Sequence, residues 1–185
     1  MEVQPADLFL KGLPDRLPEA FLRKSTGFMK KILVFSDSHR DMADMRRVLR
    51  KEKPDMVIHL GDYYADAQKL AEEFPAVPLE AVAGNCDWGL IPTEKLLETE
   101  EKKILICHGH EYGVKSDLLR LKYAALEKNA DIVLFGHTHE PFYDFDGRLH
   151  MMNPGSIGAA RYPHRDGYGL IYIENGGVYI RLMTI

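Results

Sequence analysis

Five short apolar runs, each followed directly by polar residues, constrain more strongly than any other feature what this chain can fold into. The runs are four to six residues long and rich in β-branched side chains, as is typical of buried strands. They read ILVF, DMVIHL, PLEAVA, KILIC and DIVLF, and they begin at residues 32, 55, 78, 103 and 131. Helical patterns at 42–52, 65–74 and 115–128 separate several of the runs. This alternation predicts an α/β fold with helices layered on a largely parallel sheet.

Later segments carry the pattern of antiparallel hairpins. Residues 94–107 read EKLLETEEKKILIC, two strand-like arms that turn at an acidic cluster. Residues 141–153 and 168–185 each show two strand-like arms around a DG or an NGG turn. We therefore expect antiparallel strands to extend the sheet toward the C-terminal end of the sequence.

The first 28 residues differ from the rest of the sequence. They contain three prolines and no strand-like run, and a second methionine, Met29, stands just before the first apolar run. Pro14 and Pro18 interrupt what would otherwise read as one helix face. The predicted organisation is an N-terminal appendage of uncertain order at 1–28 and a single domain at 29–185.

Composition argues against several classes of protein. A net charge of −4 with mixed signs lacks the basic face of a dedicated nucleic-acid binder, so no stable nucleic-acid complex is expected. No apolar run approaches the roughly 18 to 20 residues that span a bilayer, and no signal-peptide pattern opens the sequence. The expected setting is the cytoplasm, with no membrane partner and with Cys86 and Cys107 as free thiols. The apolar C-terminal strands fit either the core or a homo-oligomer contact.

A polar cluster follows each of the five apolar runs. The clusters read SDSH, GDYY, GNCD, HGH and GHTH, and they begin at residues 36, 61, 84, 108 and 136. Each cluster alone is typical of a helix cap or a turn, but coincidence explains five of them, in order at strand ends, poorly. Because ligands bind beyond the carboxyl ends of strands in α/β sheets, the clusters are predicted to share one rim. The candidate metal ligands on that rim are Asp37, His39, Asp62, Asn85, His108, His137 and His139.

Imidazole and oxygen ligands of this kind suit Mn, Fe, Zn or Ni, and seven of them exceed what one ion needs. Two neighbouring ions are therefore expected, with the central carboxylate of Asp62 able to bridge them. If the backbone stays extended, the D-x-H spacing at 37–39 and the H-x-H spacing at 137–139 each put two side chains on one side. Two ions about 3.5 to 4 Å apart can clamp an in-line phosphoryl displacement and lower the pKa of a bridging water.

The ordered motifs FSDSH, HLGD, GNCD, HGH and FGHTH, followed by NPGS, resemble the calcineurin-like metallophosphoesterase superfamily, and within it the small YfcE-type phosphodiesterase branch. The resemblance runs from Met29 to the C-terminus and implies a four-layer α/β/β/α sandwich with mixed sheets. It also implies two divalent ions, Mn²⁺ by preference, with Ni²⁺, Fe²⁺, Zn²⁺ or Mg²⁺ as alternatives. By this resemblance the first ion is held by Asp37, His39, Asp62 and His139, and the second by Asp62, Asn85, His108 and His137.

The function that the resemblance implies is hydrolysis of a small phosphodiester or phosphomonoester by a hydroxide that the two ions activate. Its catalytic residues are then Asp62, Asn85 and His108. A retromer subunit related to this branch implies an alternative, a non-catalytic protein-interaction scaffold on the same fold. A scaffold is free to lose metal ligands, whereas every expected position here carries a competent one. The complete ligand set favours the enzyme.

Two residues that follow Asn85 are expected to lie just behind the metal ligands. Many members of the superfamily have a histidine where this chain has Cys86, and a neutral thiol, with a pKa of about 8.5, is a weak proton donor. We interpret Cys86 as a small packed residue beside the site rather than as a nucleophile. Asp87 is expected either to orient a metal-bound imidazole or to serve as a turn or cap residue.

The stretch NPGSIGAARYPHR at 153–165 follows the last ligand motif by one short hairpin and is predicted to form a wall on the substrate side. Arg161 in this stretch is the candidate for a bidentate contact with a substrate phosphate, with solvent or an ion pair with a neighbouring carboxylate as an equal alternative. For Arg165 that alternative is favoured over the substrate contact. His59 is expected to be a buried histidine with satisfied hydrogen bonds. Trp88 is expected either to line the substrate cleft or to pack as an ordinary aromatic residue.

Overall fold

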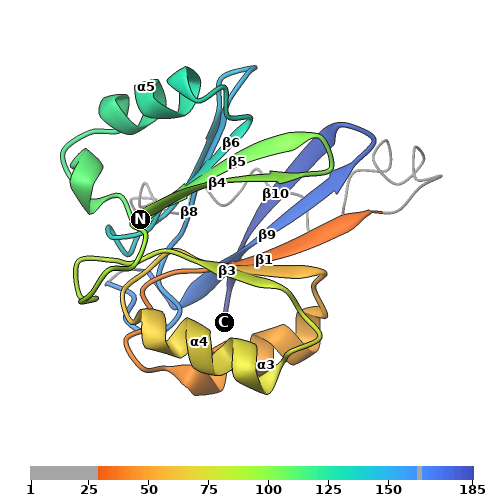
Figure 1. Cartoon of the computed structure of the whole chain (residues 1–185), viewed down its shortest axis with the longest axis vertical. Coiled ribbons are helices and arrows are strands. Elements are labelled where there is room, and N and C mark those ends of the chain that lie inside the picture. Colours follow the sequence, from red (N-terminus) through yellow and green to blue (C-terminus); the bar gives the residue numbers. More distant parts are fainter. Residues whose placement is uncertain (1–28, 162–163) are drawn as a thin grey trace, which may run out of the picture.

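The strands form two five-stranded sheets that pack face to face. The computed structural model describes residues 29–161 and 164–185, so the predicted appendage at 1–28 lies outside the described residues. One sheet contains β1 (Lys30–Phe35), β2 (Met56–His59), β3 (Leu79–Ala81), β9 (Gly167–Glu174) and β10 (Gly177–Thr184). The other contains β4 (Glu94–Thr99), β5 (Lys102–Cys107), β6 (Ile132–Leu134), β7 (Pro141–Phe145) and β8 (His150–Pro154). The strand order is β10-β9-β1-β2-β3 in the first sheet and β4-β5-β6-β8-β7 in the second (Figure 1).

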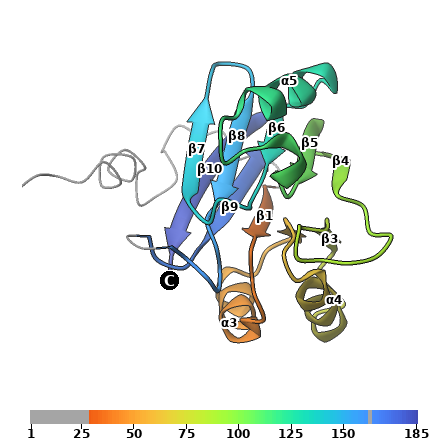
Figure 2. The ribbon, with the colours of Figure 1, turned by 90° about the vertical axis from the view of Figure 1, so that its left-hand side faces the viewer.

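Helices cover the outer faces of both sheets, which makes four layers. α3 (Met42–Glu52) and α4 (Tyr64–Glu73) lie against the first sheet, and α5 (Leu119–Glu127) lies against the second (Figures 1 and 2). A short 3₁₀ helix, η1 (His110–Tyr112), follows β5. This architecture confirms the predicted α/β/β/α fold with mixed sheets. Within residues 29–161 and 164–185, no helix has the length and apolar composition that a bilayer crossing requires.

Each central strand is buried on both faces, which explains why the apolar runs show no alternation of apolar and polar residues. In β1, Ile32 and Val34 point into the core between the sheets, where Ile132 of the second sheet also packs. Leu33 and Phe35 of the same strand point the other way, into the core beneath α3 and α4. A third core lies between the second sheet and α5. Burial of each large apolar side chain contributes about 1.5–3 kcal/mol, so the three cores are the main stabilisation of the sandwich.

The parallel strands do not form the single sheet that their alternation with helices predicts. β1, β2 and β3 pair in parallel in the first sheet, whereas β5 and β6 pair in parallel in the second. α3 and α4 are the crossover helices within the first sheet, but no helix connects β3 to β4. The chain passes through residues 84–93 without a crossover helix and starts the second sheet there.

The three predicted hairpins are confirmed. β4 pairs antiparallel with β5, β7 with β8, and β9 with β10. β9 also pairs antiparallel with β1, so the C-terminal hairpin extends the first sheet. The hairpin strands β10, β4 and β7 therefore lie at sheet edges, and β3, the parallel strand that precedes Asn85, forms the remaining edge.

The predicted helices are observed, with one changed start. The first helix matches its prediction, and the pattern at 65–74 corresponds to α4. α5 begins at Leu119 rather than at 115, because a turn precedes it in which the Ser116 N–H donates to the Gly113 carbonyl at 2.8 Å. The carboxylate of Asp117, just before the helix, accepts the N–H of its first residue, Leu119, at 2.9 Å.

Candidate metal centre

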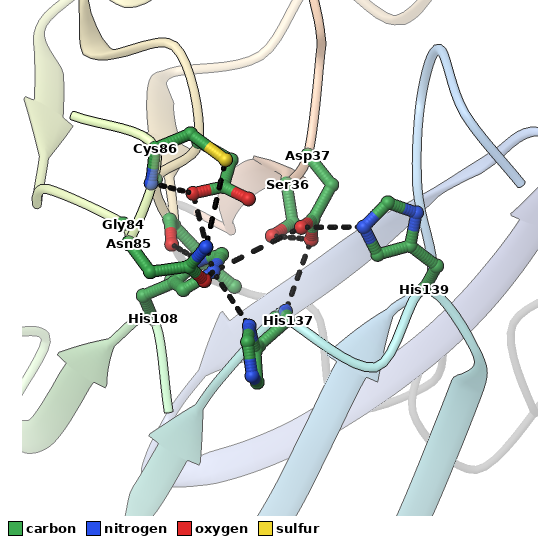
Figure 3. Close-up of polar contacts among 12 residues, drawn as sticks. Ser36, Asp37, Gly84, Asn85, Cys86, His108, His137 and His139 are labelled. Carbon is green, nitrogen blue, oxygen red and sulfur yellow. Dashed lines mark hydrogen bonds and ion pairs between the residues drawn. The ribbon is translucent and has the colours of Figure 1, made fainter. Parts of the chain in front are cut away.

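The five polar clusters lie together at one end of the sandwich, where loops from the two sheets meet (Figure 3). The first sheet contributes Asp37 and His39 after β1, Asp62 after β2 and Asn85 after β3. The second sheet contributes His108 after β5, and His137 and His139 after β6. The oxygen ligands therefore all come from one sheet, and most of the imidazoles come from the other.

Four of the predicted ligands converge closely enough to hold one ion. One ligand atom from each of Asp37, His39, Asp62 and His139 lies within 4.8 Å of the others. His139 Nε2 is 3.1 Å from Asp37 Oδ1, and His39 Nε2 is 3.9 Å from Asp62 Oδ2. All but His39 are buried, so little water reaches their polar atoms. Two carboxylates and two imidazoles form a donor set that Mn, Fe, Zn or Ni accepts.

The hydrogen bonding of His139 leaves a lone pair aimed at a carboxylate. Its Nδ1–H donates to the Ala159 carbonyl at 2.7 Å, so a neutral imidazole keeps an unprotonated Nε2 toward Asp37. The 3.1 Å contact between them is an ion-pair distance without hydrogen-bond geometry, and Asp37 Oδ1 has no hydrogen-bond partner among the described residues. The buried Nε2 of His39 lacks one there as well. Buried polar atoms without partners are rare, and a cation between these lone pairs satisfies them, so the residues fit a divalent ion.

The remaining predicted ligands gather around His108, which is fully buried. Its Nδ1–H donates to the Leu60 carbonyl at 2.8 Å, which turns Nε2 toward the other ligands (Figure 3). Nε2 is 3.2 Å from Asn85 Oδ1, 3.2 Å from His137 Nδ1 and 3.4 Å from Asp62 Oδ1. Asn85 is exposed and His137 is half-buried, so this second set lies nearer to solvent than the first.

The ionisable groups of the two sets differ in protonation. Burial raises the pKa of Asp37, but contacts with His139, His108 and a neighbouring serine outweigh it and hold the pKa below its usual value. The contact with Asp37 raises the pKa of His139 despite partial burial. Burial, reinforced by the charge of His108, lowers the pKa of His137 to about 4. His137 is thus neutral near pH 7, whereas the contact with Asp37 favours the protonated form of His139.

The ligand loops have unusual backbone conformations. Asp37, His39, Asp62, His137 and His139 all have positive φ angles, between 43° and 70°. Residues other than glycine seldom occupy this left-handed region, and those that do cluster at functional sites. The extended backbone assumed for the D-x-H and H-x-H spacings is therefore wrong. Because the chain turns at these residues, the imidazoles of His137 and His139 face different ligand sets.

Two glycines allow the ligand loops to approach each other closely. A Cβ atom on Gly84 would lie 2.2 Å from Asp62 Oδ1, and one on Gly136 would lie 1.9 Å from Ser36 Oγ. Ser36 Oγ in turn donates to Asp37 Oδ2 at 2.5 Å. A side chain at either glycine would displace a ligand or its hydrogen-bond donor, so the GN and GH motifs need glycine for packing.

Two residues of the NPGS motif hold the ligand loops, a role that the sequence interpretation missed. The buried Nδ2 of Asn153 donates to the Gly136 carbonyl at 2.9 Å and to Thr138 Oγ1 at 3.0 Å. Ser156 Oγ donates to the Asp37 carbonyl at 2.8 Å. The available signal was a pair of small polar residues, one short hairpin after the last ligand motif, in a stretch with no hydrophobic periodicity.

The residues that follow the GN motif support the loop itself. The Cys86 N–H donates to Asp62 Oδ1 at 2.9 Å, but its side chain is exposed and not disulfide-bonded, so the interpretation of Cys86 as a packed residue is wrong. Partial desolvation, reinforced by Asp62, raises the pKa of this thiol to about 11. Asp87 accepts the N–H groups of Tyr64 at 2.7 Å and Gly84 at 2.8 Å. These two bonds are those of a cap and turn residue, one of the two expected roles.

Three residues assigned to other roles are also located. Trp88 is 91 % exposed, so its interpretation as a packed aromatic residue is wrong. His59 is fully buried with both ring nitrogens hydrogen-bonded, as expected. Arg161 is exposed, and its charge acts on His139 by lowering the pKa of that imidazole, against the larger effect of Asp37. Arg161 therefore lies within electrostatic reach of the first ligand set.

Sequence comparisons identify relatives that cover most of the described fold. Residues 29–176 match the protein family described as "Calcineurin-like phosphoesterase superfamily domain". A Bacillus subtilis protein named "Probable metallophosphoesterase YsnB" is 36% identical over 155 residues, which cover 81% of this chain and 88% of that protein. A protein from Escherichia coli K12 named "Phosphodiesterase YfcE" is 27% identical over 170 residues, which cover 77% of this chain and 88% of that protein.

Solved structures share the two-sheet architecture. A predicted phosphoesterase from Streptococcus pneumoniae aligns with a TM-score of 0.71 and 28% identity over 84% of this chain and 89% of that one. Vacuolar Protein Sorting 29 from Cryptosporidium parvum aligns with a TM-score of 0.67 and 18% identity over 84% and 97% of the two chains. At that identity the second likeness shows the fold alone.

Proposed function

Because this chain belongs to the calcineurin-like phosphoesterase superfamily, we propose that it is a dinuclear metal-dependent phosphodiesterase. The observation that carries the proposal is the convergence of ligand atoms in the first set, two of which are buried without a hydrogen-bond partner among the described residues. We assign the first ion to Asp37, His39, Asp62 and His139. We assign the second to Asp62, Asn85, His108 and His137.

When bound, two such ions supply positive charge to the phosphoryl oxygens and acidify the attacking water. The chain's own residues fix where this chemistry takes place. Asp62 directs Oδ2 toward His39 and Oδ1 toward His108, so one carboxylate faces both ligand sets. The Cys86 N–H donates to Oδ1 and keeps the carboxylate in that orientation.

The imidazoles are oriented by backbone carbonyls. His108 donates its Nδ1–H to Leu60, and His139 donates its Nδ1–H to Ala159. Each bond selects the tautomer whose Nε2 lone pair points into the centre, which is the form that binds a metal ion. We propose Mn²⁺ as the working ion because imidazole and carboxylate donors suit it and thiolate ligands are not needed.

We propose small phosphodiesters as the substrates, with phosphomonoesters as the second class. The support is the likeness to a protein named "Phosphodiesterase YfcE", together with a net charge of −4, which disfavours long polyanions. Arg161, exposed beside the first ligand set, is the proposed phosphate contact. The Cys86 thiol, with a pKa of about 11, stays protonated and is a weak acid, so esters with good leaving groups are favoured.

A non-catalytic scaffold is less well supported. The Vacuolar Protein Sorting 29 likeness carries the fold alone at 18% identity. A scaffold also has no need for seven ligand-type residues around one centre or for buried atoms that lack hydrogen-bond partners there.

Metal analysis together with one assay tests the proposal. The protein is purified without chelators, loaded with Mn²⁺, desalted and measured for metal per chain and for hydrolysis of bis-p-nitrophenyl phosphate. The expected result is about two ions per chain and hydrolysis that stops on metal removal and returns with Mn²⁺. One ion per chain would overturn the dinuclear assignment. Chains that take up none after loading would support the scaffold instead.

A further inference from the structure

We infer that His59, Ser38 and Asp66 are positioning residues that hold the two carboxylate loops in the shape that binds the first ion. The inference rests on the proposed metal site, and it assigns a function to a hydrogen-bonded chain of side chains behind that site. None of the three residues belongs to the proposed ligand sets. All three are almost completely buried, which leaves no room for water to replace their hydrogen bonds.

The loops need such support because their backbones are strained. In the loop after β1, Asp37, His39 and Arg40 have φ angles of 53°, 43° and 75°. In the loop after β2, Asp62 and Tyr63 have φ angles of 56° and 74°. Non-glycine residues persist in this region only where the surroundings over-determine the conformation. Hydrogen bonds that join the two loops provide that determination.

The backbone N–H of Gly61 can only donate, and this fixes the direction of each hydrogen bond that joins His59, Ser38 and Asp66. The Gly61 N–H donates to His59 Nδ1 at 3.3 Å, so Nδ1 is the unprotonated ring nitrogen. His59 Nε2–H therefore donates to Ser38 Oγ, which lies 3.1 Å away. The single proton of the serine hydroxyl is then free for the Asp66 carboxylate, whose Oδ2 lies at 2.8 Å. Asp66 Oδ2 also accepts the Arg40 N–H at 2.8 Å.

This chain connects both strained loops through one buried path. Ser38 stands between two ligands of the loop after β1, and its hydroxyl also lies 3.3 Å from the Asp62 carbonyl. Asp66, in the first turn of α4, fixes the same loop at Arg40. His59, at the end of β2, fixes the turn at Gly61 that precedes Asp62. Loss of any one of these hydrogen bonds should let the two loops shift relative to each other. The shift would displace the ligand atoms from the positions in which they can bind one ion.

Mn²⁺ affinity, measured by calorimetry on the full chain, distinguishes positioning from general stability. Ser38→Ala should weaken binding by about 10- to 100-fold, the range found for residues that orient metal ligands. Ser38→Thr keeps the hydroxyl and should restore most of the affinity. The matched control is Tyr168→Phe, which removes one buried hydrogen bond to Glu52 away from the centre and should leave the affinity unchanged.

A double-mutant cycle tests whether the links act as one chain. Ser38→Ala and Asp66→Ala break the same path, so the double variant should bind Mn²⁺ about as weakly as the weaker of the two single variants. If the fold-losses of Mn²⁺ affinity in the two single variants multiply in the double variant, the three residues do not act as one hydrogen-bonded path and the inference is overturned. Wild-type Mn²⁺ affinity in Ser38→Ala would overturn it as well. If wild-type protein itself takes up no Mn²⁺, the proposed function fails first and this inference fails with it.

Discussion

The two sheets contribute different chemistry to one centre. The first sheet supplies the proposed oxygen ligands, of which Asp37 and Asp62 lie on left-handed turns that side-chain hydrogen bonds hold together. The second supplies imidazoles whose rings are aimed by Nδ1–H donation to carbonyls, as in His108 and His139. Left-handed turns occur on both sides, at His137 and His139 as well as at Asp37. The two sides differ in that side-chain hydrogen bonds tie the oxygen loops together, whereas Nδ1–H donation also fixes the tautomer of His108 and His139.

The support for each side comes partly from the other sheet. The carbonyl that orients His108 belongs to Leu60, at the end of the first sheet's β2. The His137 N–H, on the second sheet's loop, donates to Asp37 Oδ2 at 3.1 Å. Neither sheet holds a complete ligand set, so the centre is a property of their packing. Substitutions on the two sides should therefore change activity and metal binding by different amounts, and the order of these effects can be predicted.

The largest effect should come from Asp62, the carboxylate that is assigned to both proposed ions. Asp62→Ala should lower kcat/KM for bis-p-nitrophenyl phosphate by about 10³-fold or more, because several kcal/mol of charge stabilisation depend on the ions. Steady-state kinetics and metal analysis of the purified variant check this. Asp117→Ala, at an exposed carboxylate just before α5, is the control and should keep both metal and activity. Full activity in Asp62→Ala would contradict the assignment.

The second effect comes from adding an imidazole to the oxygen side. Cys86→His replaces a thiol whose pKa is about 11 with a group that protonates leaving groups near neutral pH. We expect kcat to rise by about 10²-fold for alkyl phosphodiesters, whose leaving groups need a proton, and little for p-nitrophenyl esters. Cys86→Ser is the control and should produce no gain. Equal changes for both esters would show that residue 86 does not face the leaving group.

The third expected effect is that a lower pH removes one of the two proposed ions before the other. The contact with Asp37 raises the pKa of His139, so protons compete for its ring as the pH falls, whereas His137, with a pKa of about 4, stays unprotonated. The first ligand set should therefore lose its ion before the second. Equilibrium dialysis against Mn²⁺ should show about two ions per chain near pH 7.5 and about one near pH 5.5. Loss of both ions in one step would count against this difference.

The smallest effect concerns a residue outside both ligand sets. Arg161→Ala should raise KM by about two- to fivefold with the metal content unchanged, because an exposed guanidinium contributes at most about 1 kcal/mol to a phosphate contact. Arg165→Ala, an exposed arginine of the same stretch, is the matched control and should leave KM unchanged. Identical kinetics for both variants would remove Arg161 from the substrate side.

The strands and the rim could be predicted because each depends on local pattern. Apolar runs such as that at 32–35 are continuous because they are buried on both faces, and polar clusters at their ends follow from the direction of parallel strands. The division into two sheets was not visible in the alternation, since it depends on a missing crossover helix after β3. The hydrogen bonds of Asn153 and the positive φ angles were also hidden, because both depend on residues distant in sequence.

The hydrogen bond between His137 and Asp37 joins residues that are 100 positions apart in the sequence. At about 5–20 residues per second, a ribosome completes Asp37 roughly 5–20 s before it reaches His137. During that interval the nascent chain carries Asp37, and later Asp62, without His137 and His139 of the second sheet. The complete centre therefore arises only late in synthesis, so hydrolytic activity begins only when folding is nearly finished.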